Sequence, residues 1–163
     1  MSLDTFPFLV TDILFYGLLV AAGVFDVLKF RIPNTIVVAL PVLFVVAALF
    51  APGAVNWLGH LGAGAVVLVC AAFLFNFNIL GGGDAKLLAS LAVWAGFGAL
   101  LPFLAVVSIL GGVLALVLLL LRQVCVRIPS VHWPLSLLPG HPLPYGVAIG
   151  GGAVVMRVMF PVF

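Results

Sequence analysis

Long apolar stretches alternate with short polar connections along the whole chain. A helix that crosses the hydrocarbon core of a bilayer needs about 20 mostly apolar residues. Stretches that approach this length lie at 8–25, 35–51, 57–78, 87–98, 101–121 and 144–162. The uncharged run 87–121 is too long for one span, and Gly96, Phe97, Gly98 and Pro102 supply a break in it. The pattern predicts an all-α, polytopic membrane protein with about six transmembrane helices.

Composition supports a membrane protein. The chain is 66% hydrophobic and only 6% charged, which a soluble domain with a polar surface does not sustain. The connections are short, so 1–163 is expected to form a single membrane-embedded domain whose main surroundings are the lipid bilayer. The net charge of +2 gives no reason to expect a nucleic-acid partner. No basic segment precedes the first apolar stretch, so we expect that stretch to be retained rather than cleaved as a signal peptide.

The basic residues predict an orientation, because cytoplasmic loops collect Lys and Arg. They follow alternate apolar stretches, at Lys29 and Arg31, at Lys86, and at Arg122 and Arg127. These connections are therefore expected on the cytoplasmic side, with both termini outside. Arg157 breaks the pattern, and we expect it to extend to the outer headgroups. Prolines within 122–141 predict irregular backbone at the interface, either a lid or a linker.

Two aspartates lie at the predicted cytoplasmic ends of apolar stretches. The acidic residues are Asp4, Asp12, Asp26 and Asp84, and an acid at membrane depth indicates a functional site. Asp26 and Asp84 share one depth, whereas the other two are expected toward the outer face without a role. The glycines at 81–83 predict positive φ and a close helix approach that brings Asp84 against another span. In such a pair one carboxyl stays protonated beside its ionised neighbour, which allows water activation and protonation of a leaving amine.

Two other interpretations of these acids remain open. In a structural one, Asp84 caps a helix while Asp26 is a solvated acid balanced by Lys29. In a proton-coupled transporter, the two acids relay protons, although only Asp12 and Arg157 continue a charged path toward the other face.

Other chemistries lack their sequence signals. No GxxxxGK[ST] phosphate loop is present. The three histidines, His60, His132 and His141, do not have metal-ligand spacing, and Cys70 and Cys125 do not form a CxxC pair. Ser90 and Ser108 lack a base at matching depth. We therefore expect no metal, no cofactor and no disulfide.

Three motifs together resemble a known family. They are Asp26 followed by Ile32-Pro33-Asn34, then the run from Gly81 to Lys86, and late in the chain Pro144-Tyr145-Gly146. This combination resembles the type IV prepilin peptidases, which are GxGD-type aspartic proteases of the membrane.

The resemblance implies a function and roles for individual residues. Asp26 and Asp84 would be the catalytic pair at the cytoplasmic membrane face, and Gly81 and Gly83 would be loop glycines that position Asp84. The substrate would be a prepilin, which loses its short basic leader peptide at the inner membrane. No segment corresponds to the methyltransferase region of longer members. The chain therefore resembles the short peptidases of tight-adherence (Flp) pilus systems, with the archaeal preflagellin peptidases as the alternative.

Basic residues near the acid pair predict a substrate contact. Prepilins of the resembled family carry a Glu shortly after the cleavage point. We expect Lys86, or otherwise Lys29 or Arg31, to pair with that Glu at the interface. The alternative is that all three serve only as cytoplasmic anchors.

Overall fold

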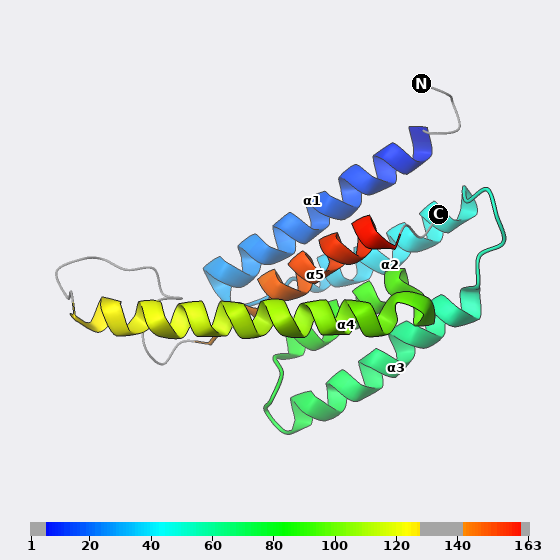
Figure 1. The fold of residues 1–163 in the computed structure, drawn as a ribbon. Helices are drawn as coiled ribbons and strands as arrows, with labels where there is room; N and C mark the ends of the chain where they lie inside the picture. The colour runs from blue at the N-terminus through cyan, green and yellow to red at the C-terminus, as the bar shows by residue number, and fades with distance from the viewer. Residues whose placement is uncertain (1–5, 128–141, 161–163) are drawn as a thin grey trace.

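The computed structural model describes residues 6–127 and 142–160. Their helices are α1 (Phe6–Lys29), α2 (Asn34–Leu49), α3 (Trp57–Asn76), α4 (Gly82–Arg127) and α5 (Tyr145–Met159), packed side by side as Figure 1 shows. No strand occurs in these two ranges. The predicted all-α class is confirmed.

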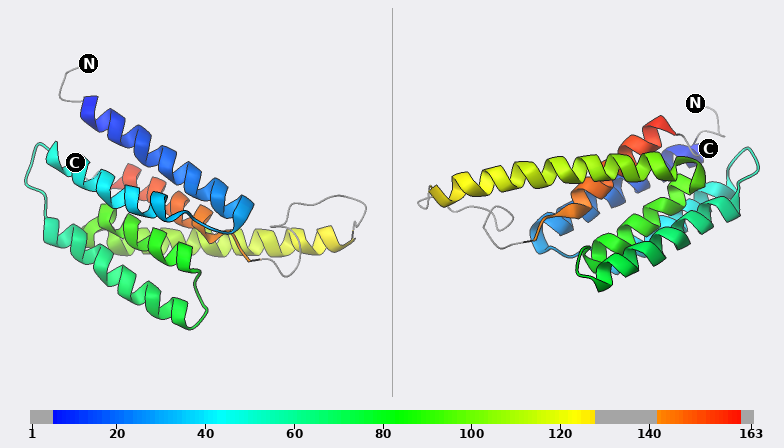
Figure 2. Two further views of the ribbon diagram at one scale, coloured as in Figure 1. Left: turned by 180° about the vertical axis from the view of Figure 1, so that it is seen from behind. Right: turned by 60° about the horizontal axis from the view of Figure 1, so that its bottom comes forward.

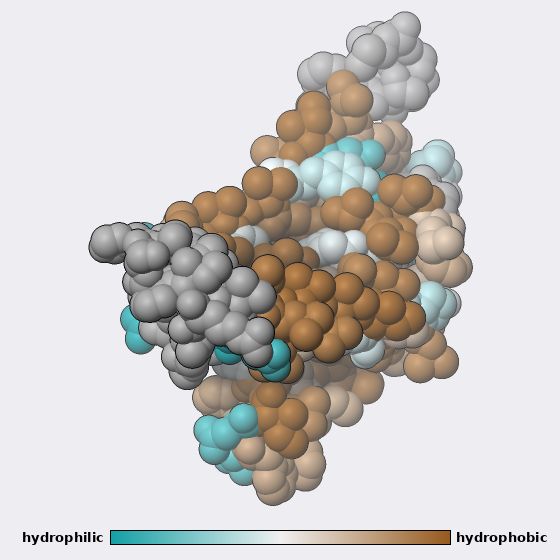
Figure 3. Space-filling view, turned by 60° about the vertical axis from the view of Figure 1, so that its left-hand side comes forward, coloured by the Kyte–Doolittle hydropathy of each residue, from teal (hydrophilic) through white to brown (hydrophobic). Residues whose placement is uncertain are grey.

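Length and apolar character indicate which helices can cross a membrane. Three stretches are long and apolar enough, namely Phe8–Lys29, Trp57–Asn76 and Gly82–Gln123. The helices α2 and α5 are also apolar but shorter, with 16 and 15 residues. Apolar side chains cover much of the surface in Figure 3, over helices that have no protein neighbour on that side. A surface of this kind is stable in lipid and not in water.

Helix α4 reverses direction at Gly96. As one straight rod its 46 residues would extend about 70 Å, more than twice the hydrocarbon thickness. Gly96 has φ 60° and ψ 176°, which is not helical, and Figures 1 and 2 show the chain doubling back there. The predicted break is confirmed at Gly96, but Gly98 and Pro102 lie inside the second helical segment.

His60 packs against the Gly96 reversal. A Cβ at Gly96 would lie 2.9 Å from the His60 ring, so glycine is required both for its φ and for this contact. The His60 Nδ1 lies 2.8 Å from the Val93 carbonyl oxygen, and the ring is 4.8 Å from that of Phe44. His60 is thus a packed side chain that joins α3 to α4 and α2.

Helix α4 also extends further than the apolar pattern predicts. It continues to Arg127, so the start of the predicted irregular connection at 122–141 is helical and that part of the prediction is wrong. The Arg122 guanidinium donates to the Pro142 carbonyl at 3.2 Å. The rest of the connection, 128–141, lies outside the described residues, as do Asp4, His132 and His141.

The core is built around Trp94, which is fully buried. Its indole N–H donates to the Leu40 carbonyl at 3.0 Å, and its ring lies 4.5 Å from Phe15 and 5.6 Å from Phe44, measured between centroids. One turn earlier, the Ser90 hydroxyl is 2.8 Å from the Val37 carbonyl oxygen. These contacts join the first segment of α4 to α2 and, through the Trp94 ring, to Phe15 of α1.

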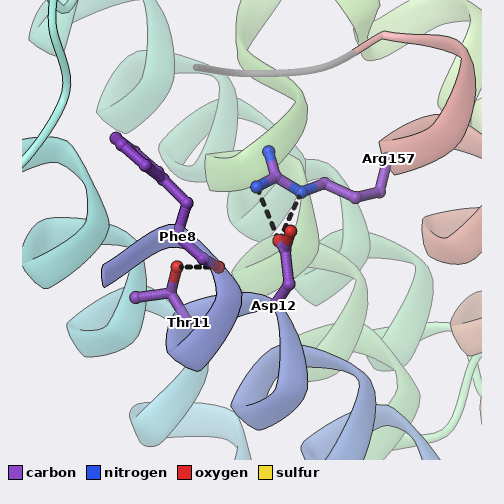
Figure 4. A network of polar contacts seen from close by, with 4 residues as sticks. All are labelled: Phe8, Thr11, Asp12 and Arg157. Carbon is purple, nitrogen blue, oxygen red and sulfur yellow. Dashed lines mark hydrogen bonds and ion pairs between the residues drawn. The ribbon is translucent and has the colours of Figure 1, made fainter. Parts of the chain in front are cut away.

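Arg157 and Asp12 form an ion pair between α5 and α1, seen in Figure 4. The guanidinium donates to Asp12 Oδ1 from Nε at 3.2 Å and from Nη2 at 2.7 Å, and it lies 5.5 Å from the Trp94 ring. Arg157 is only 9% exposed. The expectation that it extends to the headgroups is therefore wrong, because the partly exposed Asp12 carboxylate and the Trp94 ring hold its charge against the bundle.

Candidate active site

Asp26 occupies the last turn of α1. Phe30 has φ 48°, and the extended residue required before Pro33 cannot continue a helix, so α1 ends at Lys29. Asp26 is 5% exposed, and the Lys29 ammonium lies over the Phe25 ring at 5.1 Å. The interpretation of Asp26 as a solvated acid balanced by Lys29 is wrong.

Asp84 lies in the first turn of α4. Gly82 and Gly83 already belong to the helix, and in the described chain Gly96 is the glycine with positive φ. The predicted positive φ at 81–83 is therefore wrong. The predicted close approach holds best at Gly81, where a Cβ would lie 2.7 Å from Asp84 Oδ2. A Cβ at Gly83 would lie 3.5 Å from Ile32, an ordinary contact.

Asp26 and Asp84 line one cavity of about 370 Å³. The connection after α1 and the start of α4 form its other walls, through Phe30, Arg31, Ile32, Asn34, Gly81, Gly82, Gly83 and Lys86. The two carboxyl groups lie close enough to repel each other when both are ionised. Asp84 Oδ1 is buried and accepts no hydrogen bond from the described residues. The structure thus brings together the two acids that the sequence pairs.

Helix α5 contributes a contact that sequence reasoning missed. The Gly146 backbone N–H donates to Asp26 Oδ2 at 2.7 Å, and a Cβ at Gly146 would lie 2.8 Å from that oxygen. A glycine is required here because the backbone itself approaches the carboxylate. Within the sequence, Pro144-Tyr145-Gly146 is a motif without an assigned contact, and no spacing rule connects it to an acid 120 residues earlier.

The three basic candidates do not share one position. Lys86 and Arg31 line the cavity, whereas Lys29 does not. The Lys86 ammonium donates to Asn34 Oδ1 at 3.2 Å, which holds it at the rim between α4 and α2. Of the three, Lys86 has the best-defined place beside the acid pair.

The cavity is suited to general acid–base chemistry. Within the described ranges, no three His, Cys, Asp or Glu side chains gather as metal ligands do. Two neighbouring carboxyl groups supply both a proton acceptor and a proton donor. The exposed side chains of Arg31 and Lys86 lie at the edge of this cavity.

Comparison with known proteins identifies the family. No curated protein and no solved structure matches the chain. Residues 13–116 match the family model described as type IV leader peptidase. That segment contains both aspartates and the glycines before Asp84, and it spans more than half of the 163 residues. The chain therefore belongs to the type IV leader peptidase family.

Proposed function

We propose that this protein is an aspartic endopeptidase that removes the short leader from type IV, Flp-like prepilins at the cytoplasmic face of the inner membrane. The observation that carries the proposal is the shared cavity of Asp26 and Asp84, at the end of one apolar helix and the start of another. Membership of a leader peptidase family agrees with it. A transporter would require ionisable groups along a path across the bundle. The buried Arg157 and the partly exposed Asp12 are instead paired with each other.

Local hydrogen bonding assigns different roles to the two acids. Asp26 accepts a buried amide hydrogen bond, and such a bond to a charged group contributes about 1.5–3 kcal/mol. Asp84 lies in the first turn of α4, where the helix dipole favours its charge by only about 0.3–1 kcal/mol, and its Oδ1 has no donor in the described part of the chain. Asp26 is therefore the ionised carboxylate, and Asp84 holds the proton.

Cleavage then proceeds as in other two-carboxylate hydrolases. Asp26 takes a proton from water as the water oxygen bonds to the scissile carbonyl carbon. Asp84 gives its proton to the amine nitrogen as the carbon–nitrogen bond breaks. Transfer of a proton from Asp26 to Asp84 restores the starting state. Gly81 and Gly83 position Asp84 in this scheme, Gly81 beside its carboxyl group and Gly83 against Ile32.

Lys86 connects the cavity to an apolar groove. It lines both the acid cavity and a groove of about 550 Å³ between α2 and α3. The two helices meet where the Phe44 ring of α2 packs against Trp57 and His60 of α3, and the first segment of α4 forms the groove floor through Ala89, Ser90 and Val93. The apolar segment that follows the scissile bond of a prepilin fits this groove, with its carboxylate beside Lys86.

The charge pattern supports a definite orientation. In Figure 1 the connections after α1 and α3 lie at one end of the bundle, and the Gly96 reversal lies at the other. If α2, α5 and both segments of α4 each cross the bilayer, the protein has six spans. The acid pair and Lys86 then face the cytoplasm, with both termini outside.

The test is prepilin processing in membranes by the wild type and by Asp26→Asn and Asp84→Asn, at matched protein level. Each amide keeps the volume of the side chain but cannot exchange the proton, so both variants are expected to lose cleavage by about 1,000-fold or more. Normal processing by either variant would remove that residue from the acid pair.

A charge exchange tests the substrate contact. A prepilin whose Glu after the cleavage point is replaced by Lys is expected to be cleaved poorly, and Lys86→Glu is expected to restore its cleavage in preference to the native substrate. Lys29→Glu serves as the matched control, because Lys29 does not line the cavity. Equal effects of Lys86→Glu and Lys29→Glu on cleavage would indicate that Lys86 serves only as a cytoplasmic anchor.

A further inference from the structure

The N-terminal turn of α5 reaches the acid pair from outside the segment that matches the family. The family match ends at residue 116, and this turn begins near Pro144. Its Gly146 amide donates to Asp26, and the Tyr145 hydroxyl is close enough to Asp84 to interact with its charge. Displacement of this turn would therefore move a donor away from Asp26.

Gly111 on α4 provides the space for the Tyr145 ring. A Cβ at Gly111 would lie 2.5 Å from the Tyr145 hydroxyl oxygen and 2.6 Å from Cζ, closer than the 3.0 Å that real Cβ contacts respect. The ring thus lies directly against the α4 backbone. At the adjacent Gly112, a Cβ would meet nothing within 4 Å. The requirement for glycine is therefore specific to one of two neighbouring positions.

We propose that the close contact between Gly111 and the Tyr145 ring positions Tyr145. Tyr145 in turn holds the Gly146 amide within hydrogen-bond distance of Asp26. Gly111, Tyr145 and Gly146 are then positioning residues of the acid pair. The Gly146 amide donates a hydrogen bond that stabilises the charged form of Asp26. The contact at Gly111 therefore keeps Asp26 ionised and able to accept a proton from water. This inference rests on the proposed peptidase function. It adds to that function the second segment of α4, through Gly111, and the start of α5, which lies beyond the end of the family match at residue 116.

The test compares Gly111→Ala with Gly112→Ala in the full-length protein. Both changes replace a glycine in the same helix segment, so their effects on helix propensity are equal and only the contact with Tyr145 differs. Gly111→Ala is expected to lower kcat for prepilin cleavage by about 100-fold with little change in KM. Gly112→Ala is expected to match the wild type in kcat, KM and amount in the membrane.

The pH dependence separates positioning from a general loss of structure. Besides Asp26, the titratable groups around the cavity are Asp84 and Lys86 from α4, Arg31 before α2 and Tyr145 from α5. Loss of the amide donor is expected to move the acidic limb of the rate profile to higher pH in Gly111→Ala, but not in Gly112→Ala. A wild-type kcat and pH profile in Gly111→Ala would overturn the proposal, as would equal losses in both variants.

Variants of Tyr145 test whether the ring or the hydroxyl acts. Tyr145→Phe keeps the ring and is expected to lose less activity than Tyr145→Ala. In a double-mutant cycle, Gly111→Ala is expected to cause little further loss of activity in the Tyr145→Ala background, because the ring that the new methyl group would displace is absent there. Equal losses in Tyr145→Phe and Tyr145→Ala, or multiplicative losses in the cycle, would overturn positioning by the ring.

A readout without substrate keeps this inference separate from the proposed function. An apolar carbodiimide labels protonated carboxyl groups, and mass spectrometry follows the labelling of Asp26 against pH. In Gly111→Ala the labelling is expected to persist to higher pH than in the wild type and in Gly112→Ala. If the labelling shifts in Gly111→Ala but the wild type does not cleave prepilin, the peptidase function alone is refuted. If the wild type cleaves prepilin but the labelling does not shift, the positioning role of Gly111 alone is refuted.

Discussion

Gly81→Ala is expected to disable the acid pair while leaving the fold almost unchanged. The new Cβ would lie 2.7 Å from Asp84 Oδ2, whereas ordinary contacts of a Cβ begin at 3.4 Å. The carboxyl group must therefore move by several tenths of an ångström. It is the far end of a short side chain, so rotation relieves the overlap at less than about 1 kcal/mol of unfolding free energy. A reacting group displaced by up to about 1 Å loses about 10- to 100-fold in rate.

Gly83→Ala provides the matched control for this perturbation. Its Cβ would lie 3.5 Å from Ile32, within the range of ordinary contacts, and nothing closer surrounds it. Gly83 lies inside α4, where alanine gains about 0.5–1 kcal/mol of helix stability over glycine. Gly83→Ala is thus expected to lose much less activity than Gly81→Ala. The family resemblance by itself assigns Gly81 and Gly83 the same role in positioning Asp84.

The assay is the initial rate of prepilin cleavage in detergent or liposomes, together with thermal unfolding of the purified variants. Gly81→Ala should show a lower kcat with an unchanged midpoint of unfolding. If Gly83→Ala loses more activity than Gly81→Ala, the contact between Gly81 and the Asp84 carboxyl does not control the site, and the reasoning from Cβ distances fails.

Three further experiments test the scaffold around the site and the orientation of the protein in the membrane. Gly96→Ala should lower the unfolding free energy by about 2–4 kcal/mol, since it strains the backbone and displaces the His60 ring. Gly98→Ala, with open space around its Cβ, should be neutral or stabilising in the same denaturation experiment. Asp12→Asn leaves the buried charge of Arg157 without its carboxylate and should cost about 2 kcal/mol or more, and a wild-type midpoint of unfolding would show that the pair contributes nothing. In a cysteine-free background, Lys86→Cys should resist an impermeant thiol reagent added outside intact cells and Gly98→Cys should react, and the reverse pattern would refute the proposed orientation.

The apolar pattern was sufficient to predict helices of membrane length and the break in the longest one. Both features depend on residues that are neighbours in the chain, since helix formation and helix breaking are local. The pattern could not separate Gly96, which adopts a positive φ, from Gly81, Gly82 and Gly83, which do not. That difference depends on what each glycine touches, such as the His60 ring or the Asp84 carboxyl.

The sequence by itself determined that Asp26 and Asp84 lie at the same end of the bundle, because the charge pattern assigns both to one side of the membrane. Only the tertiary structure decided that they share a cavity, and that the Gly146 amide bonds to Asp26. It also decided that Arg157 pairs with Asp12 rather than extending to the headgroups. Hydrophobic periodicity says that a helix is embedded, but in lipid an apolar face has no preference for a particular neighbour. Partners are chosen by close packing at small residues and by buried polar groups that must be satisfied, and these contacts join residues more than 100 positions apart.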